Sequence, residues 1–344
     1  MEFLLLILSL FLIFISSELF TNGIENLGEK LSLSQAVVGS ILASLGTALP
    51  ETVIPLVAIL FHEGERGTEI GTGAILGAPF MLSTIGFFLI SLGVITGYFL
   101  KTRKKFEVHL EFTTFKRNFS FFLFSYSLAI FLPLLFPKIF FLNYLLALFL
   151  IFTYLFYLRQ TFRAKSSNLE LEEELHFLKF LNFLFSKKLN SKSLFLSLAC
   201  FQTILALILL LKGADLFVEN LETLSLKWGL DPLLFSLLIA PIATELPEKF
   251  NSLLWTLKGK DILAFGNIVG AMVFQTTFPV SIGLIFTPWE IKGLALVAAI
   301  ITILLNLFYL WFLKTFNKIS PYVLFLSGFS YIIYVVLIIY KFEF

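Results

Sequence analysis

Two glutamates of this chain, Glu51 and Glu248, lie in the middle of long apolar stretches. An ionised carboxylate at the centre of a bilayer costs at least about 2.5 kcal/mol, so an acid in such a place is a functional candidate by default. Each glutamate directly follows a proline, Pro50 or Pro247. Because a proline has no N–H, it leaves the backbone carbonyl one turn earlier without its helical partner. Carboxylates and free carbonyls together make an oxygen-only site, which suits hard cations such as Na⁺ and Ca²⁺ rather than soft metals.

A threonine precedes each glutamate by four residues, Thr47 in the first case and Thr244 in the second. This spacing places the hydroxyl on the same face of a helix as the carboxylate. We predict that Glu51 and Glu248 are ligands of a metal cation and that the two threonines also bind the ion. In the alternative interpretation, each glutamate is neutralised by a proton or packed against a lysine. The occurrence of the same pattern at two places favours ion binding.

The second stretch contains a third acid, Glu245, at a position where the first stretch has Ala48. Lys249 follows it by four residues, which is the spacing of an ion pair on one face of a helix. Glu245 is therefore either a further ion ligand or, as we favour, the partner of Lys249 in a structural pair. Asn267 makes either a contact with the ion or a hydrogen bond between helices. The candidates for a structural or gating role are Pro50, Pro247, Lys249 and Asn267.

The composition is that of a membrane protein. The chain has 344 residues, of which 58% are hydrophobic and 14% charged, and its mean hydropathy is +0.94. A soluble globular protein carries about 25% charged residues, so a soluble enzyme and a nucleic-acid-binding module are excluded. The single cysteine, Cys200, excludes a disulfide framework and a thiolate metal site. Since the apolar stretches contain no His/Glu metal motif and no plausible nucleophile–base pair, we expect neither an enzyme nor a cofactor.

Apolar stretches long enough to cross a bilayer recur along the chain. All must be helical, because a chain in lipid has to satisfy its own backbone hydrogen bonds. Two parts of them, 143–158 and 300–313, are apolar all round and are expected to face lipid. The predicted spans cover residues 2–21, 34–60, 73–100, 119–136, 139–158, 196–217, 232–257, 262–287, 291–313 and 321–340.

Most of the 25 Lys and Arg residues fall in loops on one side of this arrangement. By the positive-inside rule that side is cytoplasmic. We therefore expect an integral protein of the cytoplasmic membrane with both termini outside. The longest loop, 159–195, is then cytoplasmic. It is expected to carry an amphipathic helix at the membrane surface, with Leu175, Leu178, Leu181 and Phe185 on its apolar face.

The chain also contains an internal repeat. Residues 18–51 and 215–248 align without a gap and share the pattern Thr-x-Leu-Pro-Glu at their ends. Each copy begins a set of five spans, and because five is odd, the second set must run through the membrane upside down relative to the first. We predict an all-α polytopic membrane protein with ten transmembrane helices in two inverted five-helix repeats, 1–158 and 196–344, joined by the cytoplasmic loop 159–195.

Substrate sites in this design lie near the membrane midplane on broken helices. Breaks are therefore expected in the second, third, seventh and eighth spans, which contain glycines and prolines. These residues are Gly46 and Pro50, Gly77 and Pro79, Pro241 and Pro247, and Gly266 and Gly270.

The segments that carry these residues resemble the cation/calcium exchanger superfamily, which includes the sodium/calcium exchangers and their prokaryotic relatives. The family's first motif is similar to Gly46-Thr47-Ala48-Leu49-Pro50-Glu51 and Ala243-Thr244-Glu245-Leu246-Pro247-Glu248. Its second motif corresponds to residues 73–79 and 266–272, where this chain diverges. The family's Ser and Asn or Asp ligands are replaced there by Ala78, Pro79, Ala271 and Met272. The resemblance implies ten core helices in two inverted halves, with alpha regions at about 36–98 and 232–287. The ion ligands that it carries over are Thr47, Glu51, Thr244 and Glu248.

The resemblance further implies a secondary-active antiporter that exchanges Ca²⁺, or another cation, against Na⁺ or H⁺ by alternating access. Spans one and six would move against the rest, and the transported ions are substrates rather than cofactors. The alternative is a degenerate member of the family that carries a different solute or no longer transports Ca²⁺. The missing ligands and Lys249 motivate this alternative. The expected partners are inorganic cations and the lipid bilayer, with no nucleic acid, and the sequence leaves the oligomeric state open.

Overall fold

The chain folds as a bundle of helices in the computed structural model, which describes residues 1–31, 48–62, 64–137, 139–164, 174–185, 192–316 and 318–343. Within these ranges the only extended pairing is a single bridge between Val108 and Ile319. The π-helical turn η2 (Leu82–Gly86) joins α5 to α6. The α-helices are α1 (Glu2–Lys30), α4 (Leu49–Phe61), α5 (Glu65–Met81), α6 (Phe87–Phe99), α7 (Phe112–Leu135), α8 (Phe140–Ala164), α9 (His176–Phe185), α10 (Lys192–Trp228), α11 (Pro232–Thr244), α12 (Leu246–Leu257), α13 (Asp261–Gln275), α14 (Phe278–Phe286), α15 (Gly293–Phe316) and α16 (Pro321–Glu343).

Eight helical stretches of the described residues are long and apolar enough to cross a membrane. Two shorter apolar helices, Leu49–Phe61 and Pro232–Ile242, accompany them. Large apolar side chains cover much of the outer surface; on α16, Ile332 and Ile333 are 57% and 58% exposed. Such a surface is rare on soluble proteins and fits contact with lipid. The prediction of an all-helical polytopic membrane protein is confirmed. Residues 34–47 of the second predicted span lie outside the described residues, so the count of ten spans stays a prediction.

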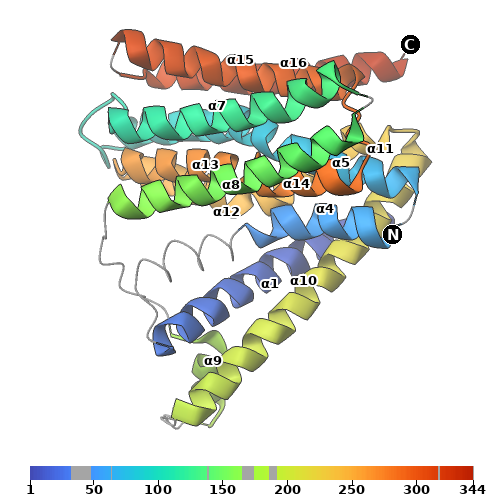
Figure 1. Ribbon diagram of the computed structural model, residues 1–344. Helices are drawn as coiled ribbons and strands as arrows, with labels where there is room; N and C mark the ends of the chain where they lie inside the picture. Colours follow the sequence, from blue (N-terminus) through green and yellow to red (C-terminus); the bar gives the residue numbers. More distant parts are fainter. Residues whose placement is uncertain are drawn as a thin grey trace.

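Helices α1 and α10 form a pair that is set apart from the others. Figure 1 shows them side by side and tilted against the remaining helices, with α15 and α16 on the opposite side of the molecule. The main contact of α10 with the rest of the bundle is through α4. Extensive packing joins the first half of the chain to the second: α1 packs on α10, α5 on α11 and α6 on α12. The two halves are therefore interleaved.

Several of the helices are longer than the apolar pattern predicts. The first span, predicted at 2–21, continues as α1 to Lys30, and the sixth, predicted at 196–217, is extended in both directions by α10. Polar side chains in the added turns find partners inside the protein. The Asn26 amide, for example, donates to the Asn22 carbonyl at 2.8 Å. A hydropathy window misses such turns because it scores these amides as if they faced lipid.

Part of the predicted loop 159–195 is helical. Helix α8 extends into it, and α9 covers the stretch that was expected to form an amphipathic helix, which confirms that helix. Its first turn is fastened to the pair α1–α10. The His176 N–H donates to the Asn22 side chain at 3.0 Å, and the Phe177 N–H donates to the Gln202 side chain at 2.9 Å. The connecting segment is thus attached to both helices of this pair.

Breaks in the membrane helices fall only partly where glycine and proline predict them. The seventh span is interrupted as expected, because α11 ends at Thr244 and α12 begins at Leu246. The predicted break of the third span at Gly77 and Pro79 is wrong. Helix α5 continues through both residues to Met81 and only then opens into the π-helical turn η2. Proline is tolerated in a membrane helix where neighbouring groups bond the freed backbone.

The predicted break of the eighth span at Gly266 and Gly270 is wrong as well. Helix α13 runs through both glycines, and the break lies at Thr276 and Thr277, between α13 and α14. Each of the two hydroxyls donates to a carbonyl of the preceding turn, at 2.9 Å and 2.8 Å. Such bonds compete with the backbone ladder of a helix. The next helix begins directly after Thr277 with Pro279 in its first turn, so a proline, rather than the two glycines, marks this break.

The stretch 300–313 does not face lipid all round, contrary to expectation. On α15, Thr302 and Asn306 are fully buried. The Asn306 amide donates to the Ser83 hydroxyl at 2.7 Å. One face of this helix therefore packs on the π-helical turn η2, and isolated polar residues in an apolar stretch mark that face.

Helices α5 and α11 approach each other closely at two glycines of α5. A Cβ atom on Gly77 would lie 2.1 Å from the Leu237 carbonyl oxygen, and one on Gly73 would lie 2.2 Å from the Leu233 carbonyl oxygen. Small residues four positions apart let two membrane helices touch along their backbones. In the first half of the chain, the second family motif therefore serves helix packing.

Substituting Gly77 by alanine is expected to destabilise the protein by about 1–3 kcal/mol, because the added methyl group overlaps the Leu237 carbonyl and must push α11 away. The midpoint of thermal unfolding, measured on purified protein in detergent, should fall accordingly. Gly266→Ala is the matched control, since a Cβ atom there meets nothing within 4 Å. Its midpoint should stay close to that of the wild type, and equal midpoints for the two variants would contradict the packing role.

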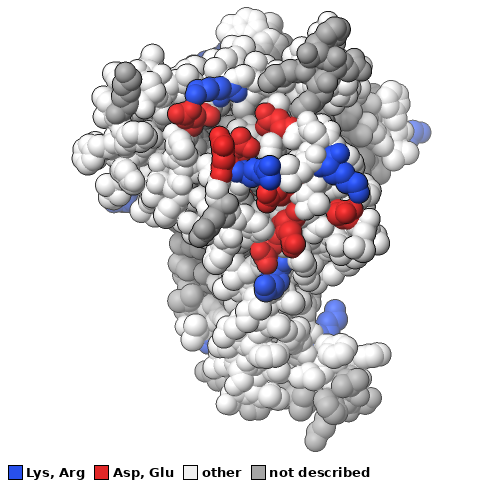
Figure 2. Space-filling view, turned by 90° about the vertical axis from the view of Figure 1, so that its right-hand side faces the viewer, with Lys and Arg blue, Asp and Glu red and all other residues white. Residues whose placement is uncertain are grey.

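Charged side chains gather at one end of the bundle. Figure 2 shows this face, the right-hand side of Figure 1, with acidic and basic groups in one patch surrounded by uncharged residues. Partly exposed ion pairs link different helices, for example Arg66 with Glu222 at 3.5 Å and Lys227 with Glu2 at 3.5 Å. Exposed pairs of this kind contribute at most about 1 kcal/mol each. The patch therefore fits the water-facing end of membrane helices and adds little to their stability.

Candidate ion-binding site

Helices α4 and α12 begin at equivalent points of the two repeated segments. Helix α4 follows Ala48 (φ −88°, ψ 4°) and α12 follows Glu245 (φ −99°, ψ 7°), so the backbone enters both helices in nearly the same conformation. The second residue of each helix is a proline, Pro50 in α4 and Pro247 in α12. Proline suits the first turn, where its missing N–H has no helical partner to lose. The prolines therefore help to fix where the two helices start.

Glu51 and Glu248 are the third residues of these two helices. The N-terminus of a helix carries a partial positive charge that stabilises anions. Both glutamates are buried, with 5% and 6% of their surface exposed. In each of them, the Oε2 atom has no hydrogen-bond partner among the described residues. A buried polar atom without a partner is costly, so each glutamate gains by accepting a cation, a proton or water.

Both glutamates line the same cavity, which has a volume of about 230 Å³. A water molecule needs only about 10–15 Å³ of such volume, so the cavity has room for an ion with several waters. Its walls come from α4 and α8 in the first half of the chain and from α12 and α13 in the second. The fold thus brings the two predicted metal ligands, Glu51 and Glu248, to one place.

Asn267 of α13 lines the cavity beside the glutamates. Its side-chain amide donates to the backbone carbonyl of Glu248 at 3.1 Å and to the Ser252 hydroxyl at 3.2 Å. The hydrogen bond between helices that was one of its two predicted roles is therefore present. It joins α13 to α12 next to the glutamate.

Of the two threonines predicted as ligands, only Thr244 belongs to the part of the chain that the structure describes. Thr47, like Gly46, lies outside the described residues. The Thr244 side chain is buried and donates to the Ala240 carbonyl at 3.3 Å. A hydroxyl that donates in this way keeps its oxygen lone pairs. A role of Thr244 in binding a cation therefore stays a prediction.

Glu245 and Lys249 lie behind the wall of the cavity. Glu245 is fully buried, and its Oε1 accepts a hydrogen bond at 3.2 Å from Gln275, which itself lines the cavity. The Lys249 ammonium lies 3.8 Å from Oε2 of Glu245. It also donates to the Pro241 carbonyl at 2.9 Å and to the Met81 sulfur at 2.9 Å. The geometry contains the ion pair that the spacing indicates, and a ligand role of Glu245 stays a prediction.

Three polar residues of α8 that the sequence pattern did not single out also line the cavity, namely Tyr154, Tyr157 and Thr161. Their spacing of three and four places them on one face of the helix. The stretch 143–158 was expected to face lipid all round, which is wrong for this face, although Phe152 is 60% exposed. Polar residues at helical spacing inside an apolar stretch were the signal that could have identified them.

The cavity offers two carboxylates and several neutral oxygen donors. In the part of the chain that the structure describes, no group of three or more His, Cys, Asp or Glu side chains is placed to hold a metal ion. An ion between Glu51 and Glu248 would take its other ligands from Asn267, from the hydroxyls of α8 or from water. Ca²⁺ accepts about six to eight oxygens in flexible geometry. The donor set therefore fits a hard cation that keeps part of its hydration shell.

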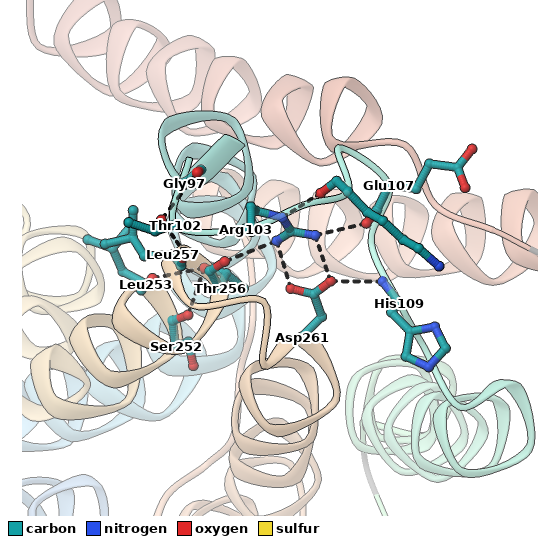
Figure 3. Close-up of polar contacts among 11 residues, drawn as sticks. Gly97, Thr102, Arg103, Glu107, His109, Ser252, Leu253, Thr256, Leu257 and Asp261 are labelled. Atoms are coloured by element: carbon teal, nitrogen blue, oxygen red, sulfur yellow. Dashed lines mark hydrogen bonds and ion pairs between the residues drawn. The ribbon is translucent and has the colours of Figure 1, made fainter. Parts of the chain in front are cut away.

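A buried ion pair fixes two of the helices that form the cavity. The Arg103 guanidinium bonds both oxygens of the Asp261 carboxylate, at 2.8 Å and 2.9 Å, and both residues are buried. It also donates to the carbonyls of Thr256 at 3.0 Å and Glu107 at 2.8 Å, while Asp261 accepts the His109 N–H at 2.8 Å. In Figure 3, Arg103 points from the loop after α6 toward the turn between α12 and α13. The ion pair of Arg103 and Asp261, called the clamp below, holds the turn that joins α12, which carries Glu248, to α13, which carries Asn267.

The loop that carries the clamp has further anchors. The Thr102 hydroxyl donates to the Leu257 carbonyl at 2.6 Å, again at the end of α12. Lys318 donates to the Glu107 side chain at 2.9 Å, and this bond holds the pKa of the Glu107 carboxyl below its usual range. The loop is thereby tied to the end of α12 and to the segment between α15 and α16.

Comparison with known proteins places the chain in one family. The model of the sodium/calcium exchanger protein family matches residues 1–162 and 198–340. The putative antiporter CaxA of Alkalimonas amylolytica is 33% identical over 140 residues, which cover 38% of this chain and 44% of that protein. The match thus spans less than half the length of this relative. An uncharacterized membrane protein of Methanocaldococcus jannaschii is 24% identical over 310 residues, or 88% of each chain.

Two solved structures share the fold. The crystal structure of the H⁺/Ca²⁺ exchanger CAX matches with a TM-score of 0.74 at 20% identity, over 97% of this chain and 82% of that one. A structure of the sodium-calcium exchanger NCX_Mj matches with a TM-score of 0.56 at 19% identity, over 98% and 99%. These likenesses concern the fold, whereas the family model spans most of the sequence and confirms the resemblance seen in the motifs. The chain belongs to the sodium/calcium exchanger protein family.

Proposed function

We propose that this protein is a secondary-active antiporter that exchanges Ca²⁺ for protons across a membrane by alternating access. One observation carries the proposal. Glu51 and Glu248 come from two helices, line one cavity and each keep a buried carboxylate oxygen without a partner among the described residues. Membership of an exchanger family agrees with a transporter rather than an enzyme.

The chemistry of the cavity supports Ca²⁺ and protons as the exchanged ions. Two carboxylates balance the charge of one divalent cation, and oxygen donors are the ligands that Ca²⁺ prefers. The same two groups can instead take up one proton each. A proton needs a single acceptor, whereas Na⁺ needs a shell of several oxygens, and Ala271 lines the cavity where the family has a polar ligand. We therefore favour protons over Na⁺, and an H⁺/Ca²⁺ exchanger is among the structures that share this fold.

Alternating access requires the site to open to each side of the membrane in turn. We assign the halves 1–158 and 196–344 to inverted five-helix repeats of a ten-helix core in the cytoplasmic membrane, with both termini outside. In this arrangement α4 ends the second span, and α11 with α12 forms the seventh. The nearly identical backbone conformations of the residues that precede α4 and α12 support this assignment. The pair α1–α10, set apart from the other helices in Figure 1, is the element that would move across the site.

Uptake of ⁴⁵Ca²⁺ into liposomes that contain the purified protein tests this function. Vesicles with an acidic interior in an alkaline medium should accumulate Ca²⁺ as protons leave, and a protonophore should abolish the accumulation. Vesicles loaded with Na⁺ and diluted into Na⁺-free medium at equal pH should accumulate little. Uptake in the Na⁺ arm alone would assign Na⁺ as the coupling ion. No uptake in either arm, with protein shown to be folded, would contradict cation exchange of Ca²⁺.

The alternative drawn from the sequence, a different solute bound through Lys249, gains no support from the geometry. A lysine that binds a solute should present its ammonium to the cavity. The described lining of the cavity does not include Lys249. The ammonium is engaged by the Pro241 carbonyl and the Met81 sulfur and lies next to Glu245.

A further inference from the structure

Lys249 is a buried cation beside a cavity that is proposed to bind cations. Only 6% of its surface is exposed. Burying an ammonium is costly unless acceptors engage its three donors. Two acceptors, the Pro241 carbonyl and the Met81 sulfur, lie at 2.9 Å each, and the Glu245 carboxylate lies at 3.8 Å. The protein therefore holds this charge in one defined place.

The Pro241 carbonyl belongs to the last turn of α11, where the seventh span is broken. It also accepts the backbone N–H of Glu245 at 3.3 Å. The C-terminal end of a helix carries a partial negative charge. Carbonyls at the ends of broken helices coordinate Na⁺ in secondary transporters. The Lys249 ammonium thus occupies the kind of position in which a free monovalent cation binds.

Lys249 is linked to the cavity through Glu245 and Gln275. The Gln275 amide donates to Glu245 at 3.2 Å and lines the cavity together with Glu51 and Glu248. Through Glu245 and Gln275 the ammonium is connected to the cavity that Glu51 and Glu248 line. Three carboxylates and one ammonium together leave two negative charges when all four groups are ionised. Two negative charges match one divalent ion or two monovalent ions.

We propose that Lys249 is a tethered monovalent cation, whose ammonium permanently takes a cation position at the end of α11. This inference rests on the proposed function, since it concerns the ions that the cavity exchanges. One Ca²⁺ then exchanges for two protons. Two positive charges move in each direction, so no net charge crosses the membrane. Removing the ammonium leaves a third carboxylate uncompensated and opens a position for a free monovalent cation.

Thermal unfolding of Lys249→Ala in detergent tests the tethered cation without any transport. In choline chloride, the variant should unfold at a lower temperature than the wild type. Na⁺, K⁺ or ammonium at equal ionic strength should raise its midpoint by several degrees, because a ligand that binds only the folded state stabilises it. The wild type should respond to none of these ions. The matched control is the double variant Glu245→Gln/Lys249→Ala, which lacks the third carboxylate and should not respond either.

Lys249→Gln, which keeps a donor for the Pro241 carbonyl but no charge, is the second variant if Lys249→Ala does not fold. A folded variant whose midpoint is the same in choline, Na⁺, K⁺ and ammonium overturns the proposal. So does a wild-type Ca²⁺ flux that follows the membrane potential when the potential is clamped with K⁺ and valinomycin. Failure of the proposed function is distinguishable, because it appears as no Ca²⁺ flux by the wild type under any gradient. The melting result stands independently of that outcome.

Discussion

Glutamine in place of Glu248 is expected to reduce Ca²⁺ uptake to the level of protein-free vesicles, and Glu51→Gln is expected to do the same. Each substitution keeps the size of the side chain and removes its charge. Two unit charges about 4 Å apart interact by about 4 kcal/mol at an effective dielectric constant of about 20, which corresponds to about a thousandfold in affinity. An amide also cannot take up the proton that returns in the second half of the cycle. Each substitution should therefore impair both the binding of Ca²⁺ and the return transport of protons.

The measurement is the initial rate of ⁴⁵Ca²⁺ uptake driven by an outward proton gradient. Glu65→Gln is the matched control, because it removes an exposed acid at the start of α5, away from the cavity lining. This variant should keep the wild-type rate. Wild-type uptake by a folded Glu51→Gln or Glu248→Gln variant would falsify the assignment of the site.

Arg103→Met is expected to lower the free energy of unfolding by about 3–5 kcal/mol, because it leaves Asp261 as a buried charge without its partner. The Arg103 guanidinium also donates hydrogen bonds to the backbone carbonyls of Thr256 and Glu107. In the variant these carbonyls lose their donor. The effect should appear as a much lower midpoint of unfolding in detergent. Uptake of Ca²⁺ should fall as well, since the turn between α12 and α13 positions two walls of the cavity.

An exposed ion pair on the same loop provides the control for this prediction. Lys318 bonds Glu107 with side chains that are 60% and 67% exposed, so Lys318→Met should change stability by only about 0–1 kcal/mol. The double variant Arg103→Met/Asp261→Leu should recover part of the lost stability, because it also removes the buried Asp261 carboxylate that Arg103→Met leaves without a partner. If Arg103→Met and Lys318→Met proved equally stable, the clamp would have no special role.

The two glutamates could be predicted from sequence because their signals are local. A proline in the first helical turn and an acid directly after it mark a helix start within a few residues. The recurrence of this pattern placed Glu51 and Glu248 in equivalent positions before any packing was known. The pair of Glu245 with Lys249 follows from the same local geometry, since residues four apart share a helical face.

The rest of the site depends on contacts that a single sequence does not reveal. Arg103 lies in a cluster of basic residues that the charge pattern explains by membrane orientation alone. Its partner Asp261 is 158 residues away, and only the packing of α6 on α12 brings them together. The wall formed by Tyr154 and Tyr157 was missed because hydropathy averages over all faces of a helix. The break at Thr276 was missed although Pro279 lies in the first turn of α14, because the glycines Gly266 and Gly270 were taken as the signal in this span.

The interleaving of the two halves has a consequence for the synthesis of the protein. Helices α1, α5 and α6 leave the ribosome long before their main partners α10, α11 and α12 have been translated. During that interval the surface of α5 at Gly73 and Gly77 has no helix to pack against and must be covered by lipid or by the insertion machinery. Tertiary folding can then be completed only late in translation. A nascent chain that stops after the first half is expected to enter the membrane without reaching a native structure.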